Sequence, residues 1–554
     1  MYGSTNSNND DFLKVMDMKR RDFIKCLTAG LAASLIPDVK AKAAGQAGSP
    51  GTSKMNVLLI DIEDMTAASL GCYGNPLAKT PNLDRFAVGG VRFERCYCQA
   101  PMCNPSRSSF LTGLRPDSTR VYTNSDPMDR LLPEGTMSLP ELLRRKVIYS
   151  INIGKLFHHT WTAEKQLGAF DRLEFCERPK GYKGRSEGYP KYLNDALKLL
   201  PRPRFRYSAD PEEEKRLKEL KAQRDKIWRT AKEGTREYNK ARAMFQQPQA
   251  NVVGDSGLLE EQEGDGRKAR MAVHILEEMA KTKKQFFLSV GISKPHTPLR
   301  CPKKYLDLYD LNDIPEPQAP PERDENIPDI AKRNGRNYDI FNSHYKHPVT
   351  PLAARKAVMA YYACASFIDA QISLILDALE SEGLRDNTIV IILSDHGFQL
   401  GEHNLWSKYT LFEQTTRVPL MVHIPGKMSN PAVCDEIVEL VDLVPTLCEL
   451  LEMPQPDNIE GTSLYPLLRR PKQPWKKAAF TVCSIAGYVG RSVRTKRWRY
   501  ALWQSRKTSS QELELYDLQA DPWEQNNLAK NPDYAQEKAR LAAMLKAGWS
   551  GAKP

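Results

Sequence analysis

Asn56-Val57-Leu58-Leu59-Ile60-Asp61-Ile62 is a short, β-rich apolar run that ends abruptly in two acids, Glu63 and Asp64. Three further runs have the same character: Phe286–Ile292, Thr388–Ser394 and Val418–Ile424. Such runs are typical of buried parallel strands. Helical patterns, such as Met271–Met279 and Arg355–Leu379, lie between them. We therefore predict an α/β fold with helices on both faces of a large, mostly parallel sheet, and a ligand site at the carboxyl ends of its strands.

The composition is that of a globular protein. The 554 residues are 41% hydrophobic and 27% charged, which excludes a disordered or fibrous chain. Lys and Arg (80) exceed Asp and Glu (68), giving a net charge of +12 without a polybasic block. This charge is compatible with a polyanionic substrate and does not indicate nucleic acid. No stretch approaches the ~20 apolar residues of a membrane helix, and the longest is Cys26–Ile36, so we expect no stable membrane insertion.

The N-terminus carries the pattern of an export signal. Lys19-Arg20-Arg21 precedes the Cys26–Ile36 run, and Ala41-Lys42-Ala43 follows it as a small-x-small cleavage site. The paired arginines predict that residues 1–43 are a twin-arginine-type signal, with Met16 as an alternative start. The alternative is a buried helix. We expect the twin-arginine export machinery as a partner, and a periplasmic or extracellular location. Eleven cysteines match no zinc template, and an oxidising compartment permits disulfides whose pairing the sequence does not give.

The remaining chain is predicted to form two domains. Residues 52–465 are assigned to a catalytic domain with a charged helical insertion at about 205–250 that either packs on its surface or binds a partner. Residues 471–554 are assigned to a C-terminal subdomain. It contains four short alternating strands and a closing helix, and the strands are predicted at Phe480–Ser484, Tyr488–Arg494, Trp498–Trp503 and Glu512–Leu518.

The most specific local signal is Cys103-Asn104-Pro105-Ser106-Arg107-Ser108-Ser109-Phe110-Leu111-Thr112-Gly113. Pro105 fits a first helical turn and Gly113 fits a helix stop, so Cys103 is expected at the N-terminus of a short helix. Backbone N–H groups there favour an anion, and Arg107 adds a positive charge one turn later. In this setting we expect the cysteine pKa to be depressed, which would allow a thiolate nucleophile.

Acidic residues directly follow two of the predicted strands, and they are expected at the same edge of the sheet. Glu63-Asp64 follows the first strand, and Asp395-His396 follows Thr388–Ser394. Carboxylates this close repel each other unless a cation compensates them, and hard oxygen donors favour calcium or magnesium. Asp61 ranks below Glu63 as a ligand. Taken alone, Glu63 and Asp64 could be two exposed acids in a turn.

Basic residues also follow the predicted strand ends, in three segments. Lys155 and His158 follow an Ile-rich run, His296 follows Phe286–Ile292, and Lys408 lies just after the Asp395 segment. Singly, such residues are usually structural histidines or surface lysines. Together they predict a cationic pocket for a small oxyanion, with histidines able to move protons near neutral pH.

The Cys103–Gly113 stretch is also the signature of the formylglycine-dependent sulfatases, and the resemblance covers most of the chain after the signal. Within that family the sequence is most similar to the iduronate-2-sulfatase group. The blocks that carry the resemblance are Asn56–Gly74, Thr80–Asp84, Arg115–Asp117, Gly154–His158, Phe286–Pro302, Ser394–Pro419, Leu440–Leu447 and Glu514–Leu518. The resemblance implies an alkaline-phosphatase-like fold with a small C-terminal antiparallel sheet.

The resemblance also implies the roles of the site residues. Cys103 would be converted to formylglycine by a formylglycine-generating enzyme, and one Ca²⁺ would bind between it and Glu63, Asp64, Asp395 and His396. Lys155, Lys408 and His296 would bind the sulfate ester, with His296 protonating the leaving oxygen. Arg107 would hold the aldehyde hydrate, and His158 would deprotonate it so that sulfate is released. Glu63 departs from the commoner aspartate, and His396 stands where many sulfatases have asparagine.

The expected activity is hydrolysis of sulfate esters on a uronic-acid-containing, anionic polysaccharide or oligosaccharide. Two alternatives stay open at this point. One is a phosphatase or phosphonate monoester hydrolase of the same superfamily, because sulfate and phosphate are similar oxyanions. The other is a catalytically silent polysaccharide-binding protein.

Overall fold

The computed structural model describes residues 54–158, 163–174, 253–317, 326–332, 349–426 and 432–554, together with Glu219 and Thr235. The predicted export signal at 1–43 and, apart from those two single positions, the predicted insertion at about 205–250 lie outside the described residues.

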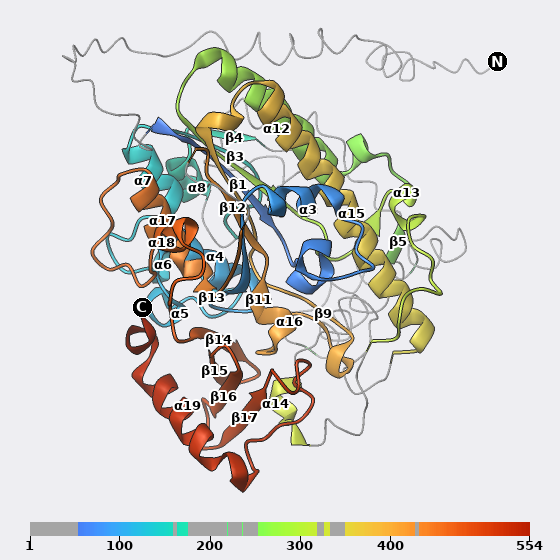
Figure 1. The fold of residues 1–554 in the computed structure, drawn as a ribbon, viewed down its shortest axis with the longest axis vertical. Helices are drawn as coiled ribbons and strands as arrows, with labels where there is room; N and C mark the ends of the chain where they lie inside the picture. Colours follow the sequence, from blue (N-terminus) through green and yellow to red (C-terminus); the bar gives the residue numbers. More distant parts are fainter. Residues whose placement is uncertain are drawn as a thin grey trace. The chain divides into compact units, whose positions relative to one another are not determined.

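The central sheet is built around β1 (Asn56–Ile62), as its sequence predicts. Parallel strands flank it on both sides, β8 (Thr388–Ser394) and β6 (Phe286–Ile292), and β3 (Tyr149–Gly154) and β4 (Arg172–Glu174) continue the parallel part beyond β6 (Figure 1). The register aligns the carboxyl ends, because Ile62 lies opposite both Ile292 and Ser394. Residues that follow these strands are therefore delivered to one edge of the sheet.

The run Val418–Ile424 was wrongly predicted as a parallel strand. It is divided at Pro419 into β11 (Arg417–Val418) and β12 (Leu420–His423), and both pair antiparallel with β2 (Val91–Tyr97). β12 is also antiparallel to β8. Proline lacks the N–H that a continuous strand ladder needs, so the run is interrupted there. A strand parallel to β8 would need a long crossover, usually a helix, to return the chain to the other end of the sheet, and no long helix lies among the described elements between β8 and β12. The ninth strand, β13 (Ala432–Glu439), pairs parallel with β2.

Helices cover both faces of the sheet, as predicted. Leu58 and Ile60 of β1 face a cluster formed with α3 (Pro81–Val88), α12 (Gly264–Thr282) and α15 (Pro351–Ser381). Val57 and Leu59 alternate to the other face, where α4 (Cys103–Thr112), α7 (Leu139–Arg145), α17 (Leu443–Leu450) and α18 (Tyr465–Arg469) pack. β1 is thus buried on both sides, which explains its continuous apolar sequence.

Within the described part of the chain, α15 alone is long and apolar enough to cross a membrane by length and composition. Its most apolar window is 72% buried inside the protein. Packing between the sheet and α12 accounts for that apolar surface.

The C-terminal region forms the predicted antiparallel sheet, in the order β14 (Ala479–Ile485), β15 (Tyr488–Arg494), β16 (Trp498–Ser505) and β17 (Gln511–Asp517). The closing helix α19 (Ala535–Ala547) places Leu541 in the apolar cluster of this sheet. Residues 52–554 form one compact unit, so this sheet packs with the main one. A buried carboxylate joins them: Glu439 of the main sheet binds Nη1 and Nη2 of Arg115 and accepts a hydrogen bond from Phe480 N of β14.

The remaining elements are short: α5 (Pro116–Thr119), α6 (Met128–Leu131), α8 (Ala163–Ala169), β5 (Val253–Asp255), β7 (Leu299–Cys301), α13 (Lys303–Leu306), α14 (Asp329–Lys332), β9 (Gln399–Leu400), β10 (Trp406–Ser407) and α16 (Glu413–Thr416). Nine cysteines lie in the described residues, and all nine are free thiols.

Candidate active site

The acidic residues predicted at the strand ends meet beyond β1 and β8. Asp64 N donates to Asp395 Oδ1 at 3.1 Å, which ties the two exits together. Asp64 has a positive φ of 64°, an uncommon conformation for a residue with a side chain. Tyr361 of α15 supports this turn: its hydroxyl donates to Asp64 O at 2.6 Å and accepts from Thr66 N at 3.0 Å. The carboxylate of Asp64 is therefore held in one orientation.

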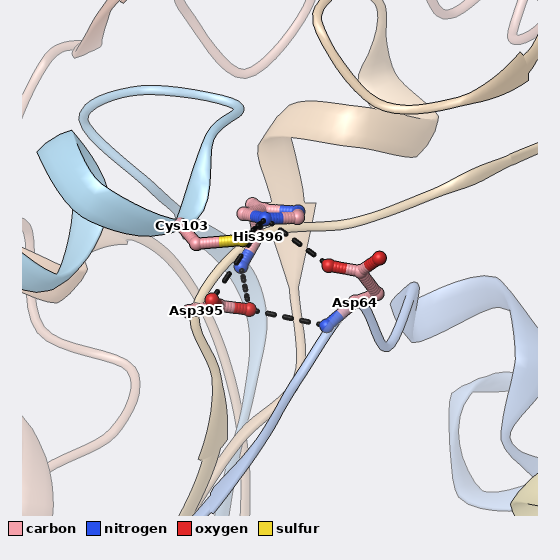
Figure 2. A group of neighbouring side chains, drawn as sticks. All are labelled: Asp64, Cys103, Asp395 and His396. Carbon is pink, nitrogen blue, oxygen red and sulfur yellow. Dashed lines mark hydrogen bonds and ion pairs between the residues drawn. The ribbon is translucent and has the colours of Figure 1, made fainter. Parts of the chain in front are cut away.

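Cys103 begins α4, as its sequence predicts, and Gly113 ends that helix with φ 72°. Its Sγ lies 3.2 Å from His396 Nε2, 3.1 Å from Lys408 Nζ and 3.5 Å from Glu63 Oε1. Figure 2 shows the side chain pointing from the helix toward Asp64, Asp395 and His396. The predicted nucleophile position and the predicted acidic cluster therefore form a single site.

Four side chains in this site lie close enough together to hold a metal ion. Asp64, Cys103, Asp395 and His396 are all buried, and one potential ligand atom from each lies within 4.8 Å of the others. His396 Nδ1 lies 2.9 Å from Gly397 O, and a carbonyl can only accept, so this nitrogen carries a proton. Nε2 then faces Cys103 Sγ and Asp64 Oδ1, each 3.2 Å away. Two carboxylates and an imidazole fit a divalent cation.

Glu63 lies beside this four-residue group and belongs to a second one, with Asp64 and His296. Its Oε1 forms a close ion pair with Lys155 Nζ. The five predicted metal residues are thus neighbours, but Glu63 is turned toward the basic residues.

Arg107 of α4 bonds two of the buried acidic residues, Asp395 and Asp61. Its Nε donates to Asp395 Oδ2 at 3.0 Å, and its Nη1 bonds Asp61 as well as the carbonyls of Lys155 and Leu156 at 3.0 and 2.9 Å. Within the described residues its Nη2 is buried and has no hydrogen-bond partner. A buried N–H without a partner is costly, so this atom is suited to a group that the polypeptide itself does not supply.

The expected depression of the Cys103 pKa is wrong. Burial raises the pKa of the thiol to about 12, with Asp395 and Glu63 adding to the increase and Lys155 and Lys408 only partly opposing it. The helix N-terminus and the lysines do not compensate for removing a thiolate from water among carboxylates. An unmodified Cys103 is therefore a neutral thiol.

The carboxyl groups differ in their ionisation. Burial opposes ionisation of Asp395, but His396 and then Arg107 bring its pKa down to about 2. Burial likewise opposes ionisation of Glu63, and Lys155 followed by His296 holds its pKa well below the usual range. For Asp61, burial dominates over Arg107 and raises the pKa to about 7.

The predicted basic residues surround the same point. Lys408 Nζ contacts both Asp64 oxygens, at 2.9 and 3.1 Å, and its side chain is only 4% exposed. Ser407 and Tyr409 on either side of it have positive φ angles of 78° and 77°. Strained backbone of this kind is concentrated at functional sites.

Lys155 and His296 form the open side of the site, with side chains 30% and 31% exposed. His296 Nε2 lies 3.9 Å from both Glu63 Oε1 and Asp64 Oδ2. Its Nδ1 is 2.8 Å from Thr297 O and so carries a proton, which leaves Nε2 facing the site. Gly291 makes room for this arrangement, because a Cβ there would lie 2.0 Å from Lys155 O.

His158 is buried three residues after Lys155, and it is not among the partners of Cys103 Sγ. Its predicted role stays a prediction.

Three supporting residues were not identified from the sequence: Tyr361, Ser106 and Ser394. Ser106 donates to Asp395 O, and Ser394 Oγ accepts from Met65 N and donates to His396 O, both at 2.9 Å. Ser106 lies within the Cys103–Gly113 stretch, and Ser394 ends the predicted strand Thr388–Ser394. Tyr361 lies in the middle of a helical pattern that carried no signal.

A family model described as "Sulfatase" matches residues 55–453. The chain belongs to the sulfatase family. A second model, described as "N-sulphoglucosamine sulphohydrolase, C-terminal", matches residues 401–549, which include the C-terminal antiparallel sheet. The protein is thus a sulfuric ester hydrolase, and the predicted enzyme class is confirmed.

Individual relatives agree with this assignment. This sulfatase is 30% identical over 467 residues to iduronate 2-sulfatase of Mus musculus, covering 78% of this chain and 74% of that protein. It is 27% identical over 520 residues to Delta 4,5-hexuronate-2-O-sulfatase of Bacteroides thetaiotaomicron, covering 90% and 89%. Phosphonate monoester hydrolase of Agrobacterium radiobacter shares its fold, with a TM-score of 0.64 at 22% identity over 89% of this chain and 95% of that one. The predicted alkaline-phosphatase-like fold is confirmed.

Proposed function

We propose that this sulfatase removes sulfate from a uronic acid of an anionic polysaccharide or oligosaccharide, using formylglycine at position 103 and one bound Ca²⁺. The observation that carries the proposal is the placement of Cys103 Sγ within 3.5 Å of a lysine, a histidine and a carboxylate. A neutral thiol there is a poor nucleophile, whereas the aldehyde hydrate of formylglycine offers two hydroxyls.

The cation site consists of Asp64, Asp395, His396 and the oxygen that replaces Cys103 Sγ, with Glu63 beside them. When bound, Ca²⁺ would act as a Lewis acid toward the sulfate oxygens and the hydrate. The unpartnered Nη2 of Arg107 would bind the hydrate and fix its orientation.

The lysines and histidines perform the remaining steps. Lys408, held between Asp64 and position 103, and Lys155, at the open side, bind the sulfate oxygens and offset the charge that develops on them. His296 directs Nε2 into the site, and in its imidazolium form, with a proton on each ring nitrogen, it gives the Nε2 proton to the leaving sugar oxygen. His158 takes the proton of the second hydroxyl; the aldehyde re-forms as the carbon–oxygen bond to the sulfate group breaks, and sulfate leaves.

Two observations support a uronate substrate. The relatives include an iduronate 2-sulfatase and a hexuronate-2-O-sulfatase. The chain also carries a net charge of +12, which favours association with a polyanion. We further propose maturation by a formylglycine-generating enzyme and export through the twin-arginine machinery to the periplasm or the extracellular space.

Two measurements on one preparation test the proposal. Peptide mass spectrometry should show a loss of about 18 Da at Cys103, and the same enzyme should release sulfate from 2-O-sulfated uronate disaccharides. Cys103→Ala should fold and bind Ca²⁺ but release no sulfate. Sulfate release by that variant at the wild-type rate would refute the formylglycine mechanism. Faster cleavage of a phosphonate monoester than of any sulfate ester would favour the superfamily alternative instead.

A further inference from the structure

The first turn of α12 contacts the segment that carries His296. Asp265 is 3% exposed, and its two carboxylate oxygens accept hydrogen bonds from consecutive backbone N–H groups, Ser293 N and Lys294 N, each at 2.8 Å. His296 follows two residues later. The carboxylate thus fixes the backbone at the point where the chain leaves β6 toward the site.

Lys268, one turn further along α12, completes a buried ion pair. It is 2% exposed, and its Nζ donates to Asp265 Oδ1 at 2.9 Å and to Ser293 Oγ at 2.6 Å. Its methylene stem lies against Gly154, where a Cβ would be 3.0 Å from Lys268 Cε. Gly154 directly precedes Lys155. One ion pair therefore contacts both segments that form the open side of the site.

The attachment of α12 to the sheet does not depend on this pair. The helix packs through an apolar stripe that comprises Ala269, Ala272, Ile275, Leu276 and Met279. The charged first turn instead contacts the segments that follow the strands. The hydrogen bonds made there compensate for the desolvation of the buried Asp265–Lys268 pair.

We propose that Asp265 and Lys268 are positioning residues that hold His296 in register with the leaving oxygen of the sulfate ester. The inference rests on the proposed function, in which His296 protonates the leaving oxygen. A general acid matters most when the leaving group is a poor one, such as a sugar alkoxide, and little for a phenolate that leaves unaided. Loss of the positioning pair should therefore impair sugar sulfates far more than aryl sulfates.

The test compares Asp265→Asn with wild type on a 2-O-sulfated uronate disaccharide and on 4-nitrophenyl sulfate. Asparagine keeps the volume but presents an amide to one of the two backbone N–H groups and removes the partner charge of Lys268. We expect kcat on the disaccharide to fall by about 10–100-fold, the effect of misplacing a catalytic group, and kcat on the aryl sulfate by less than about threefold. Rates are normalised to the formylglycine content measured at Cys103.

Asp369→Asn is the matched control. Asp369 is also buried, at 2% exposed, and its carboxylate also accepts from two consecutive backbone N–H groups, those of Asn82 and Leu83, but it lies on α15 against α3. This variant should lower both rates equally or not at all.

Equal losses on both substrates, or no loss, in Asp265→Asn would overturn the inference. If that variant does not fold, Lys268→Met decides the matter by the same ratio, because it keeps the stem against Gly154 and removes only the ammonium. Wild-type enzyme that releases sulfate from neither ester would instead refute the proposed function, so the two failures are distinguishable.

Discussion

Replacing Tyr361 by Phe should weaken Ca²⁺ binding although Tyr361 is not a ligand. The hydroxyl is the only group lost, and its two partners lie on either side of the strained Asp64 turn. Asp64 O and Thr66 N would both be left buried without a partner, at about 1–3 kcal/mol each. We therefore expect the free energy of unfolding to fall by about 2–6 kcal/mol. The strained backbone of Asp64 would lose the hydrogen bonds that hold it in place. Residues that orient a metal ligand in this way contribute about 10–100-fold to metal affinity.

The assay is unfolding by denaturant in calcium-buffered and calcium-depleted solution. At a Ca²⁺ concentration of 100 times the wild-type Kd, binding stabilises the protein by about 2.7 kcal/mol. A site that binds Ca²⁺ tenfold more weakly gives only about 1.4 kcal/mol of stabilisation at the same concentration. The calcium-dependent part of the free energy of unfolding should therefore shrink by about half. Isothermal titration calorimetry measures the affinity directly.

Tyr73→Phe is the control for the loss of a hydroxyl. Tyr73 is buried as well, and its hydroxyl accepts from Leu420 N at 2.9 Å and lies 3.2 Å from Phe93 O. It should reduce stability by a similar amount and leave the calcium-dependent part intact. If Tyr361→Phe keeps the full calcium-dependent stabilisation, or if Tyr73→Phe loses it equally, the reasoning about the Asp64 turn is refuted.

Two further outcomes follow from charges near the site and at the sheet junction. Lys408→Met removes the ammonium between Asp64 and position 103, so we expect kcat/KM on the sulfated disaccharide to fall by about 10²–10³-fold in steady-state assays; activity near wild type would contradict its role. Burial opposes ionisation of Glu439, but Arg115 and then Lys476 lower its pKa to about 2 from the usual 4.5. Its ionised form therefore stabilises the fold above about pH 4.5, and this contribution should be lost as the pH falls toward 2. In Glu439→Gln, the free energy of unfolding measured with urea should depend less steeply on pH. An unchanged pH dependence would show that Glu439 is not the group responsible.

The positions of the main catalytic segments could be predicted because they depend on local sequence. Runs such as Asn56–Ile62 and Thr388–Ser394 are buried on both faces, so their apolar sequence marks them as parallel strands. Parallel strands that start together end at one edge, which brings Asp64 and Asp395 together without knowledge of the packing. The Cys103 helix is likewise bounded by its own proline and glycine.

What failed depends on contacts that are distant in sequence. The direction of Val418–Ile424 depends on which neighbour it pairs with, and an apolar run does not encode that choice. The pKa of Cys103 depends on the balance between burial, two lysines and two carboxylates, none of which is local in sequence; only the helix N-terminus is. Tyr361 comes from a helix nearly three hundred positions away from Asp64, and nothing in its own helical pattern distinguishes it from a core residue.

Glu63 illustrates where a motif stops predicting a role. Matched by position, it belongs with Asp64, Asp395 and His396 around the cation. In the structure its longer side chain carries the carboxylate to Lys155, and the four-residue group is formed without it. The two adjacent acids at the end of β1 therefore have different partners: Glu63 pairs with Lys155, whereas Asp64 lies in the four-residue group with Asp395.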